Sequence, residues 1–237
     1  YSASQSYIDT NIHGTHNICQ SAILNKCNRV IHTSTSEVYG TALYVPIDES
    51  HPMQAQSPYS ASKIGADAIA TSFNNSFDMP LTIIRPFNTY GPRQSARAII
   101  PTVITQLASG NKVLNLGATS PTRDFNYVED TARGFVELAM CDQAVGKTVN
   151  LGSNSEISMF DLIQLIGDIF ECEITIKTDA SRIRPKDSEV FRLWADNTLA
   201  KKLIGSHPEF SIRDGLQETI DWVTKAENLM RYKSGSY

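Results

Sequence analysis

A tyrosine and a lysine four residues apart, Tyr59 and Lys63, are the clearest candidates for chemistry in this chain. On a helix this spacing puts both side chains on one face, so the ammonium group can lie near the phenol and favour its ionised form. A tyrosine with an ordinary pKa of about 10 is a poor base at neutral pH, and moving that pKa near 7 requires roughly 4 kcal/mol. Such pairs also arise by chance, so the pair needs support from neighbouring residues.

That support comes from a segment rich in hydroxyl groups, which reads TSTSEVYG over residues 33–40. The run before it, residues 29–34, is short and β-branched, as is typical of a buried parallel strand that ends in a functional loop. Ligands of open α/β sheets bind beyond the carboxyl ends of the strands. The sequence therefore predicts that Thr35, Ser36 and Glu37 lie near Tyr59 and Lys63.

The elements that must position these residues alternate along the chain. Apolar residues recur at helical spacing over 7–24 and 59–77, and β-rich runs cover 29–34 and 81–85. Further helices are predicted near 98–108, 129–140, 158–170 and 213–225, with strands near 113–116, 148–151 and 173–177. This alternation favours an α/β fold with a parallel sheet covered by helices on both faces.

Composition excludes several classes of partner. The 237 residues are 41% hydrophobic and 19% charged, and the net charge of -4 is spread without long runs, so no surface for nucleic acid or an anionic membrane is indicated. The four cysteines and five histidines show no metal-ligand spacing, so we assign no metal. Neither a signal peptide nor a membrane-length apolar run is found, and we expect a cytoplasmic protein that binds a small molecule.

Five segments carry a family resemblance: YIDTNIHGT (7–15), STSEVYG (34–40), SPYSASK (57–63), RPFNTYGPR (85–93) and RDFNYVED (123–130). With them the chain resembles the extended short-chain dehydrogenase/reductase family and, within it, the nucleotide-sugar 4,6-dehydratases. The resemblance implies a Rossmann-like, doubly wound parallel sheet that binds NAD, formed by residues 1–95. It implies a smaller α/β domain for the nucleotide sugar in residues 96–237, with segments near 123–152 interleaved with the first domain.

The resemblance also implies catalytic roles. Thr35, Tyr59 and Lys63 would form the oxidoreductase centre, in which Tyr59 takes the proton of the sugar's C4 hydroxyl while NAD accepts hydride. Glu37 would remove the C5 proton, and water would leave C6 with a proton from Glu37 or Ser36. Many of these dehydratases have Asp where this chain has Ser36, which leaves the identity of the C6 acid open.

Binding residues follow from the same resemblance. The cofactor would contact Ser34, Tyr59, Lys63 and Pro86, and the nucleotide-sugar substrate would contact Asn88, Arg123, Asn150 and Arg184. A guanidinium group suits the diphosphate because its fork holds phosphate oxygens bidentately. Alternatives stay open for two of them: Arg123 can instead pair with Asp124 or Asp130, and the run 182–186 around Arg184 also fits an exposed turn. Asn11 lies in a predicted helix, where asparagine is disfavoured, so we expect it to hold backbone or water near the site.

The glycine-rich turn that cradles the pyrophosphate of a dinucleotide, Gly-x-x-Gly-x-x-Gly, does not occur in these residues. We expect the opening strands and helices that carry it to precede residue 1. We predict that the 237 residues alone bind NAD weakly. Isothermal titration with NAD measures this, and an affinity in the micromolar range or tighter would refute it.

Several functions are compatible with these motifs. The favoured substrate is UDP-N-acetylglucosamine, chosen by similarity to bacterial enzymes of glycan biosynthesis. UDP-glucuronate decarboxylases and GDP-mannose 4,6-dehydratases share the Thr-Ser-Glu arrangement, although the decarboxylases tend to have acidic residues where this chain has Ser60 to Ser62. A catalytically inactive scaffold would normally lack Tyr59 or Lys63. Many relatives form homodimers through a four-helix bundle, for which residues 7–24 and 59–77 are the candidates.

Overall fold

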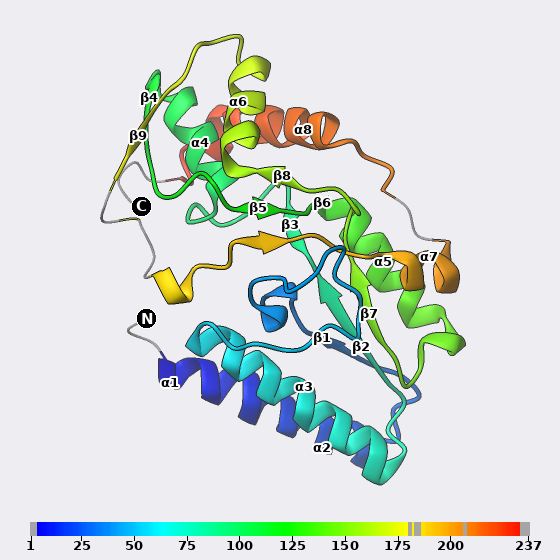
Figure 1. The fold of residues 1–237 in the computed structure, drawn as a ribbon. Coiled ribbons are helices and arrows are strands. Elements are labelled where there is room, and N and C mark those ends of the chain that lie inside the picture. The colour runs from blue at the N-terminus through cyan, green and yellow to red at the C-terminus, as the bar shows by residue number, and fades with distance from the viewer. Residues whose placement is uncertain (1–3, 180–181, 183–185, 206–207, 233–237) are drawn as a thin grey trace.

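A parallel three-stranded sheet lies at the centre of the lower half of the molecule (Figure 1). The structure is a computed structural model that describes residues 4–179, 182, 186–205 and 208–232. The strands are β1 (Val30–Thr33), β2 (Leu81–Pro86) and β7 (Thr148–Leu151), in the order β1-β2-β7. All of β2 except its last residue is buried, which explains its continuous apolar sequence.

Helices cover both faces of this sheet. Ile83 packs with α2 (Gly14–Leu24) and α3 (Pro58–Phe77), and the next residue, Ile84, packs with α5 (Val128–Met140) and α7 (Thr198–Ile204). Neighbouring residues of a strand point to opposite faces of the sheet, so β2 packs against a layer of helices on each face. The predicted α/β fold with a doubly wound parallel sheet is therefore confirmed.

A second core lies in the upper half, around α4 (Ile99–Ala108), α6 (Met159–Ile169) and α8 (Ile212–Thr224). Beside them β4 (Val113–Leu116) pairs in parallel with β9 (Thr175–Thr178). The chain returns from this core to the central sheet through α5 and β7 (Figure 1). The domain boundary near residue 95 stays a prediction.

Short strands between the two halves complete the fold. They are β3 (Asn88–Tyr90) paired with β6 (Phe125–Tyr127), and β5 (Thr122–Arg123) between β8 (Ile157–Ser158) and β10 (Arg192–Leu193). A last helix, α9 (Ala226–Leu229), follows α8. Among the described residues no helix is both long and apolar enough to cross a membrane.

The predicted N-terminal helix contains a change of helical geometry. It consists of α1 (Ser4–Tyr7), a π-helical segment over Ile8–His13, and α2. The π-helical segment contains Asn11, whose side-chain amide donates to the Ser62 hydroxyl of α3 at 2.9 Å. The Ser62 hydroxyl in turn donates to the carbonyl oxygen of Tyr59. Asn11 therefore holds the first turns of α3, the helix that carries Tyr59.

Candidate active site

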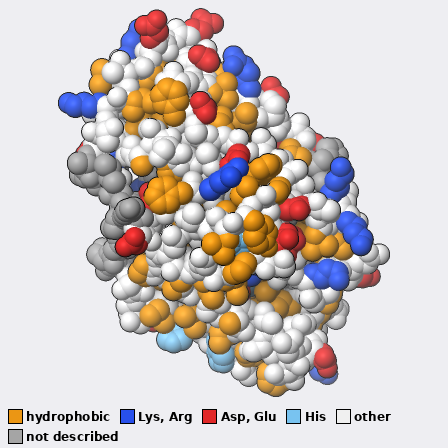
Figure 2. All heavy atoms as spheres, viewed as in Figure 1, with side chains coloured by type: hydrophobic (Ala, Val, Ile, Leu, Met, Phe, Trp, Pro, Cys, Tyr) orange, Lys and Arg blue, Asp and Glu red, His pale blue; other side chains and the backbone are white. Residues whose placement is uncertain are grey.

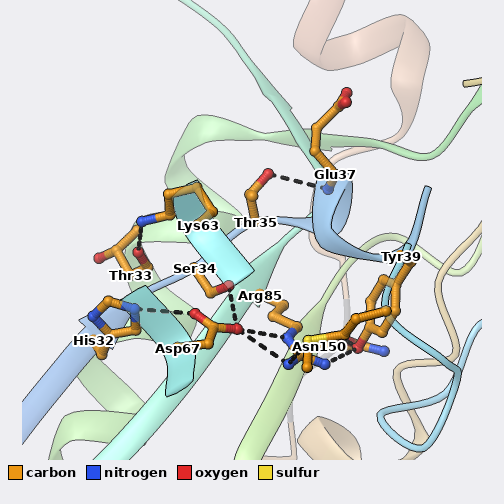
Figure 3. Close-up of polar contacts among 11 residues, drawn as sticks. His32, Thr33, Ser34, Thr35, Glu37, Tyr39, Lys63, Asp67, Arg85 and Asn150 are labelled. Atoms are coloured by element: carbon orange, nitrogen blue, oxygen red, sulfur yellow. Dashed lines mark hydrogen bonds and ion pairs between the residues drawn. The ribbon is translucent and has the colours of Figure 1, made fainter. Parts of the chain in front are cut away.

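A short 3-10 helix, Ser36–Tyr39, follows β1 and places Glu37. Thr35 caps this helix, because its hydroxyl accepts a hydrogen bond from the Glu37 amide at 3.2 Å. Thr35 and Ser36 are buried, whereas the Glu37 side chain is partly exposed. In Figure 3 the Glu37 carboxylate points away from the buried polar side chains around Asp67.

The start of α3 fixes Tyr59. Ser57 caps the helix and forms a capping box with Ser60, and Pro58 occupies the first helical position, where its ring is favourable. Tyr59 therefore lies in the first turn, with its ring edge-on to Tyr7 at 5.6 Å between centroids. Lys63 follows one turn later and donates from Nζ to the carbonyl oxygen of Thr33 at 2.5 Å (Figure 3).

Two adjoining pockets open at this edge of the sheet. Tyr59 and Glu37 line a pocket of about 400 Å³, together with Tyr7, Gln56, Ser57, Pro58, Ser188 and Val190. Glu37 also lines a pocket of about 450 Å³ that contains Asn88 and Arg123. The phenol and the carboxylate thus share one cavity, and the carboxylate stands where that cavity meets the second.

The second pocket carries more positive than negative charge. Its described lining includes three guanidinium groups, those of Arg97, Arg123 and Arg182, and two carboxylates, those of Glu37 and Glu189. The side-chain oxygen of Asn88 is buried and has no hydrogen-bond partner among the described residues. A buried acceptor without a donor indicates a place that a ligand or ordered water fills. An anionic ligand with hydrogen-bond donors, such as a nucleotide sugar, has the matching chemistry.

Burial, not Lys63, dominates the ionisation of Tyr59 in this structure. Burial raises the pKa of Tyr59, the interaction with Thr35 opposes this shift, and the charge of Glu37 adds to it. The expected contact of Lys63 with the phenol is not present, since its ammonium group is held by Thr33. Burial also lowers the pKa of Lys63. The phenol therefore needs a further positive charge nearby to act as a base.

A family model described as GDP-mannose 4,6 dehydratase matches residues 1–219. The chain belongs to this family. It is 30% identical over 219 residues to the low-salt glycan biosynthesis protein Agl12 of Haloferax volcanii, covering 92% of this chain and 69% of that protein. It is 30% identical over 229 residues to human dTDP-D-glucose 4,6-dehydratase, covering 94% of this chain and 64% of that enzyme. The chain thus spans roughly two thirds of the length of these relatives.

Solved structures of the family have the same fold. The dTDP-glucose 4,6-dehydratase DesIV of Streptomyces venezuelae, with NAD bound, superimposes with a TM-score of 0.86 at 27% identity, covering 98% of this chain and 71% of that one. The UDP-glucuronic acid 4-epimerase of Bacillus cereus, with UDP-glucuronic acid and NAD bound, gives 0.83 at 28% identity, covering 91% and 68%. The predicted family and the Rossmann-like fold are confirmed.

Arg123 has a carboxylate and a carbonyl partner in the wall of the second pocket. One of its terminal nitrogens donates to the Thr122 carbonyl oxygen at 2.9 Å, and the other lies 3.5 Å from the Glu189 carboxylate. The guanidinium group also lines the pocket that contains Asn88. Its role in binding the diphosphate stays a prediction. Arg184, the other predicted arginine, lies outside the described residues.

Asn150 does not lie with the other predicted substrate residues. It is fully buried, accepts from the Tyr39 hydroxyl at 2.7 Å and donates to the Ile47 carbonyl oxygen at 3.0 Å. Both of its polar groups tie β7 to the segment after β1, so its contact with the substrate stays a prediction. Ser34 is also turned inward, toward Asp67, and Pro86 ends β2 at the edge of the sheet.

Several site residues were not found from the sequence. Gln94, Arg97 and Glu189 line the Arg123 pocket, and Ser188 lines the Tyr59 pocket. Gln94 and Arg97 lie just after the RPFNTYGPR segment, whereas Ser188 and Glu189 lie far along the chain from all five motifs. Neither periodicity nor motif spacing marks them. Arg97 follows the RPFNTYGPR segment by four residues, which was the one available signal.

Asp124, next to Arg123, gives a pH-dependent prediction. It is fully buried and accepts from Ser153 and from the Ala195 amide, and burial raises its pKa to about 6. The unfolded value is about 3.9, so the folded protein binds more protons between these values and its stability falls as pH rises through them.

We therefore expect wild type to lose roughly 2 kcal/mol of unfolding free energy relative to Asp124→Asn between about pH 4 and pH 6.5, with no further change above. Urea denaturation of both proteins across this range measures the difference. A difference that stays constant or grows with pH would contradict the raised pKa of Asp124.

Proposed function

We propose that this protein removes water from a nucleotide sugar to give the 4-keto-6-deoxy sugar, with NAD as its cofactor. The observation that carries the proposal is the position of Glu37, which faces the Tyr59 pocket on one side and the Arg123 pocket on the other. A hexose at this junction meets the phenol and the carboxylate, while its diphosphate meets the guanidinium group. The dTDP-glucose 4,6-dehydratases among its relatives support the reaction class.

The residues at the edge of the sheet fit the nicotinamide end of NAD. Lys63 reaches the carboxyl end of β1, and Pro86 stands at the carboxyl end of β2, which is where open α/β sheets bind ligands. Tyr59 lies one helical turn before Lys63. Ser34 helps to fix this edge of the sheet, because its hydroxyl donates a hydrogen bond to Asp67 of α3. Bound NAD would supply the hydride acceptor and donor that the reaction needs, and the positive charge that the buried phenol lacks.

The chain's own groups supply the proton transfers. Tyr59 takes the proton of the C4 hydroxyl, and Thr35 hydrogen-bonds the same oxygen. The C4 ketone acidifies the C5 hydrogen, which Glu37 removes as a proton. Glu37 then gives that proton to the C6 hydroxyl as it leaves as water. When hydride adds to C6, Glu37, protonated again from solvent, protonates C5, and Tyr59 returns its proton to solvent. We assign this acid role to Glu37 because Ser36 is buried and is not among the described residues that line either pocket.

We propose UDP-N-acetylglucosamine as the sugar nucleotide, on the resemblance to bacterial glycan-pathway enzymes. The names of the relatives favour dTDP-glucose as the second candidate. Offering the full-length protein both nucleotides, together with GDP-mannose and UDP-glucuronate, and comparing kcat/KM separates them. A release of carbon dioxide from UDP-glucuronate would identify a decarboxylase instead.

Replacing Arg123 by Gln tests the diphosphate site. A hydrogen bond to a charged group contributes about 1.5–3 kcal/mol, so KM for the nucleotide sugar should rise roughly 10- to 100-fold with a smaller change in kcat. The matched control is Arg133→Gln, because Arg133 pairs with Asp130 and Glu209 in another part of the fold. Equal KM values for wild type and Arg123→Gln would remove Arg123 from the substrate site.

We also propose a homodimer formed through α2 and α3. The only charged residues of these helices are Lys63 and Asp67, neither of which is exposed, while Ile18 and Phe77 are 65% and 58% exposed. Figure 2 shows few charged side chains over the lower part of the molecule, where α2 and α3 lie. Sedimentation of wild type and of Ala68→Arg, a change on the exposed face of α3, tests the proposal: wild type should sediment as a dimer and the variant as a monomer.

A further inference from the structure

Behind the site, α3 buries a carboxylate that the proton transfers do not use. Asp67 is 3% exposed and lies one helical turn beyond Lys63. Figure 3 shows it at the centre of a group of polar side chains from three elements. It accepts from the Ser34 hydroxyl at 2.8 Å, contacts His32 Nε2 at 3.0 Å, and pairs with the Arg85 guanidinium group at 3.1 Å.

These contacts join the two segments that carry the catalytic residues. Asp67 belongs to the helix of Tyr59 and Lys63, whereas Ser34 is the residue directly before Thr35 at the end of β1. Arg85 of β2 extends the connection, since it donates to the Tyr39 hydroxyl at 3.0 Å, and Tyr39 ends the 3-10 helix of Glu37. One buried side chain thus connects α3 with the segments that carry Thr35 and Glu37.

Stability alone is a weak explanation for this arrangement. A buried ion pair gives little net stabilisation compared with apolar side chains of similar volume, because both charges lose their hydration. The carboxylate does have an electrostatic consequence nearby: its charge raises the pKa of Lys63, against the lowering effect of burial. The charged groups that face Asp67 are Lys63 on its own helix and Arg85 on β2, and the imidazole of His32 on β1 also contacts it.

We propose that Asp67 is a positioning residue of the active site: it fixes α3 to the end of β1, so that Tyr59, Thr35 and Glu37 face one sugar. Its charge also favours the protonated form of Lys63, one helical turn away. This rests on the proposed dehydratase function. Asp67 touches neither of the two pockets in the described structure, so it acts through Ser34, Arg85 and Lys63.

The test is Asp67→Asn in the full-length protein, which removes the charge and keeps the size. We expect kcat to fall about 10- to 100-fold with KM changed less than about threefold, because positioning affects the reacting geometry more than binding. The alkaline limb of the pH profile of kcat should move to lower pH, since Lys63 loses its proton more easily without the carboxylate and beside an unpaired Arg85.

A second measurement does not depend on turnover. In protein labelled with ¹³C-lysine, the Lys63 resonance, assigned with Lys63→Arg, should titrate at lower pH in Asp67→Asn than in wild type. Asp67→Glu keeps the charge, so its Lys63 titration should stay near that of wild type while kcat falls. Asp67→Glu also serves if Asp67→Asn does not fold.

The matched control is Asp130→Asn, which changes another buried carboxylate with an arginine partner, Arg133. It should lose stability but keep kcat, the pH profile and the Lys63 titration. An Asp67→Asn protein with the kcat and the Lys63 titration of wild type would overturn the inference. Absence of turnover in wild type with every nucleotide sugar would instead count against the proposed function, and the Lys63 titration would still test the role of Asp67.

Discussion

Tyr59→Phe should lower kcat by about 10²- to 10⁴-fold, the range that general acid–base catalysis contributes. Without its hydroxyl group the side chain cannot take the proton of the C4 hydroxyl, so neither the oxidation nor any later step can proceed. The ring remains and keeps its edge-on packing against Tyr7, so the fold should be preserved. Steady-state product formation and thermal unfolding of the same preparation measure both effects.

The matched control for this variant is Tyr90→Phe. Tyr90 is buried in the second core, where its hydroxyl donates to the Ile212 carbonyl oxygen at 3.2 Å. Losing that bond should cost about 0.5–1.5 kcal/mol of stability and leave kcat unchanged. If Tyr59→Phe retained more than half of the wild-type rate, Tyr59 would not be the base.

Glu37→Gln should block the reaction after the oxidation at C4 and lower the rate of dehydration by about 10²- to 10⁴-fold. The amide cannot accept the C5 proton or protonate the leaving C6 hydroxyl, but it keeps the size and the capping contact of the Glu37 backbone with Thr35. In deuterated water the wild-type enzyme should exchange the C5 hydrogen, whereas the variant should not. Mass spectrometry of the recovered sugar nucleotide measures this exchange.

Glu129→Gln is the control for that change, because Glu129 is an exposed carboxylate in the first turn of α5. It should exchange and dehydrate as wild type does. Exchange at C5 that persists in Glu37→Gln at the wild-type rate would assign the base to another residue, and would also remove the reason for placing the C6 acid at Glu37.

Long elements with a clear period could be predicted from the sequence. The helices α3 and α5 and the strands β1, β2 and β7 lie within a few residues of their predicted bounds, because each buries one face or both faces against the same core. The seven-residue helix α7, which also covers the central sheet, was not predicted. The five short strands β3, β5, β6, β8 and β10 have two or three residues each, too few to show a period. The π-helical geometry at Ile8–His13 was also not predicted, since its sequence differs little from that of an ordinary amphipathic helix.

The site was predictable where a motif lies directly on an element and not where contacts join distant segments. Glu37 and Tyr59 share a cavity as expected, since both follow the carboxyl edge of the sheet. The position of Asn150 could not be read from its place at the end of β7, because its partners, Tyr39 and Ile47, come from a loop more than 100 residues earlier. The same is true of Glu189 beside Arg123, which only the tertiary fold brings together.

The most direct test of a phenol and a carboxylate acting on one bound hexose is mass spectrometry of the nucleotide sugar after incubation of the full-length protein with UDP-N-acetylglucosamine and NAD. The predicted product is lighter than the substrate by one water and carries one solvent deuterium at C5 when the reaction runs in deuterated water. A product of unchanged mass, as an epimerase would give, or substrate recovered intact from each nucleotide sugar of the panel, would contradict the proposed dehydration.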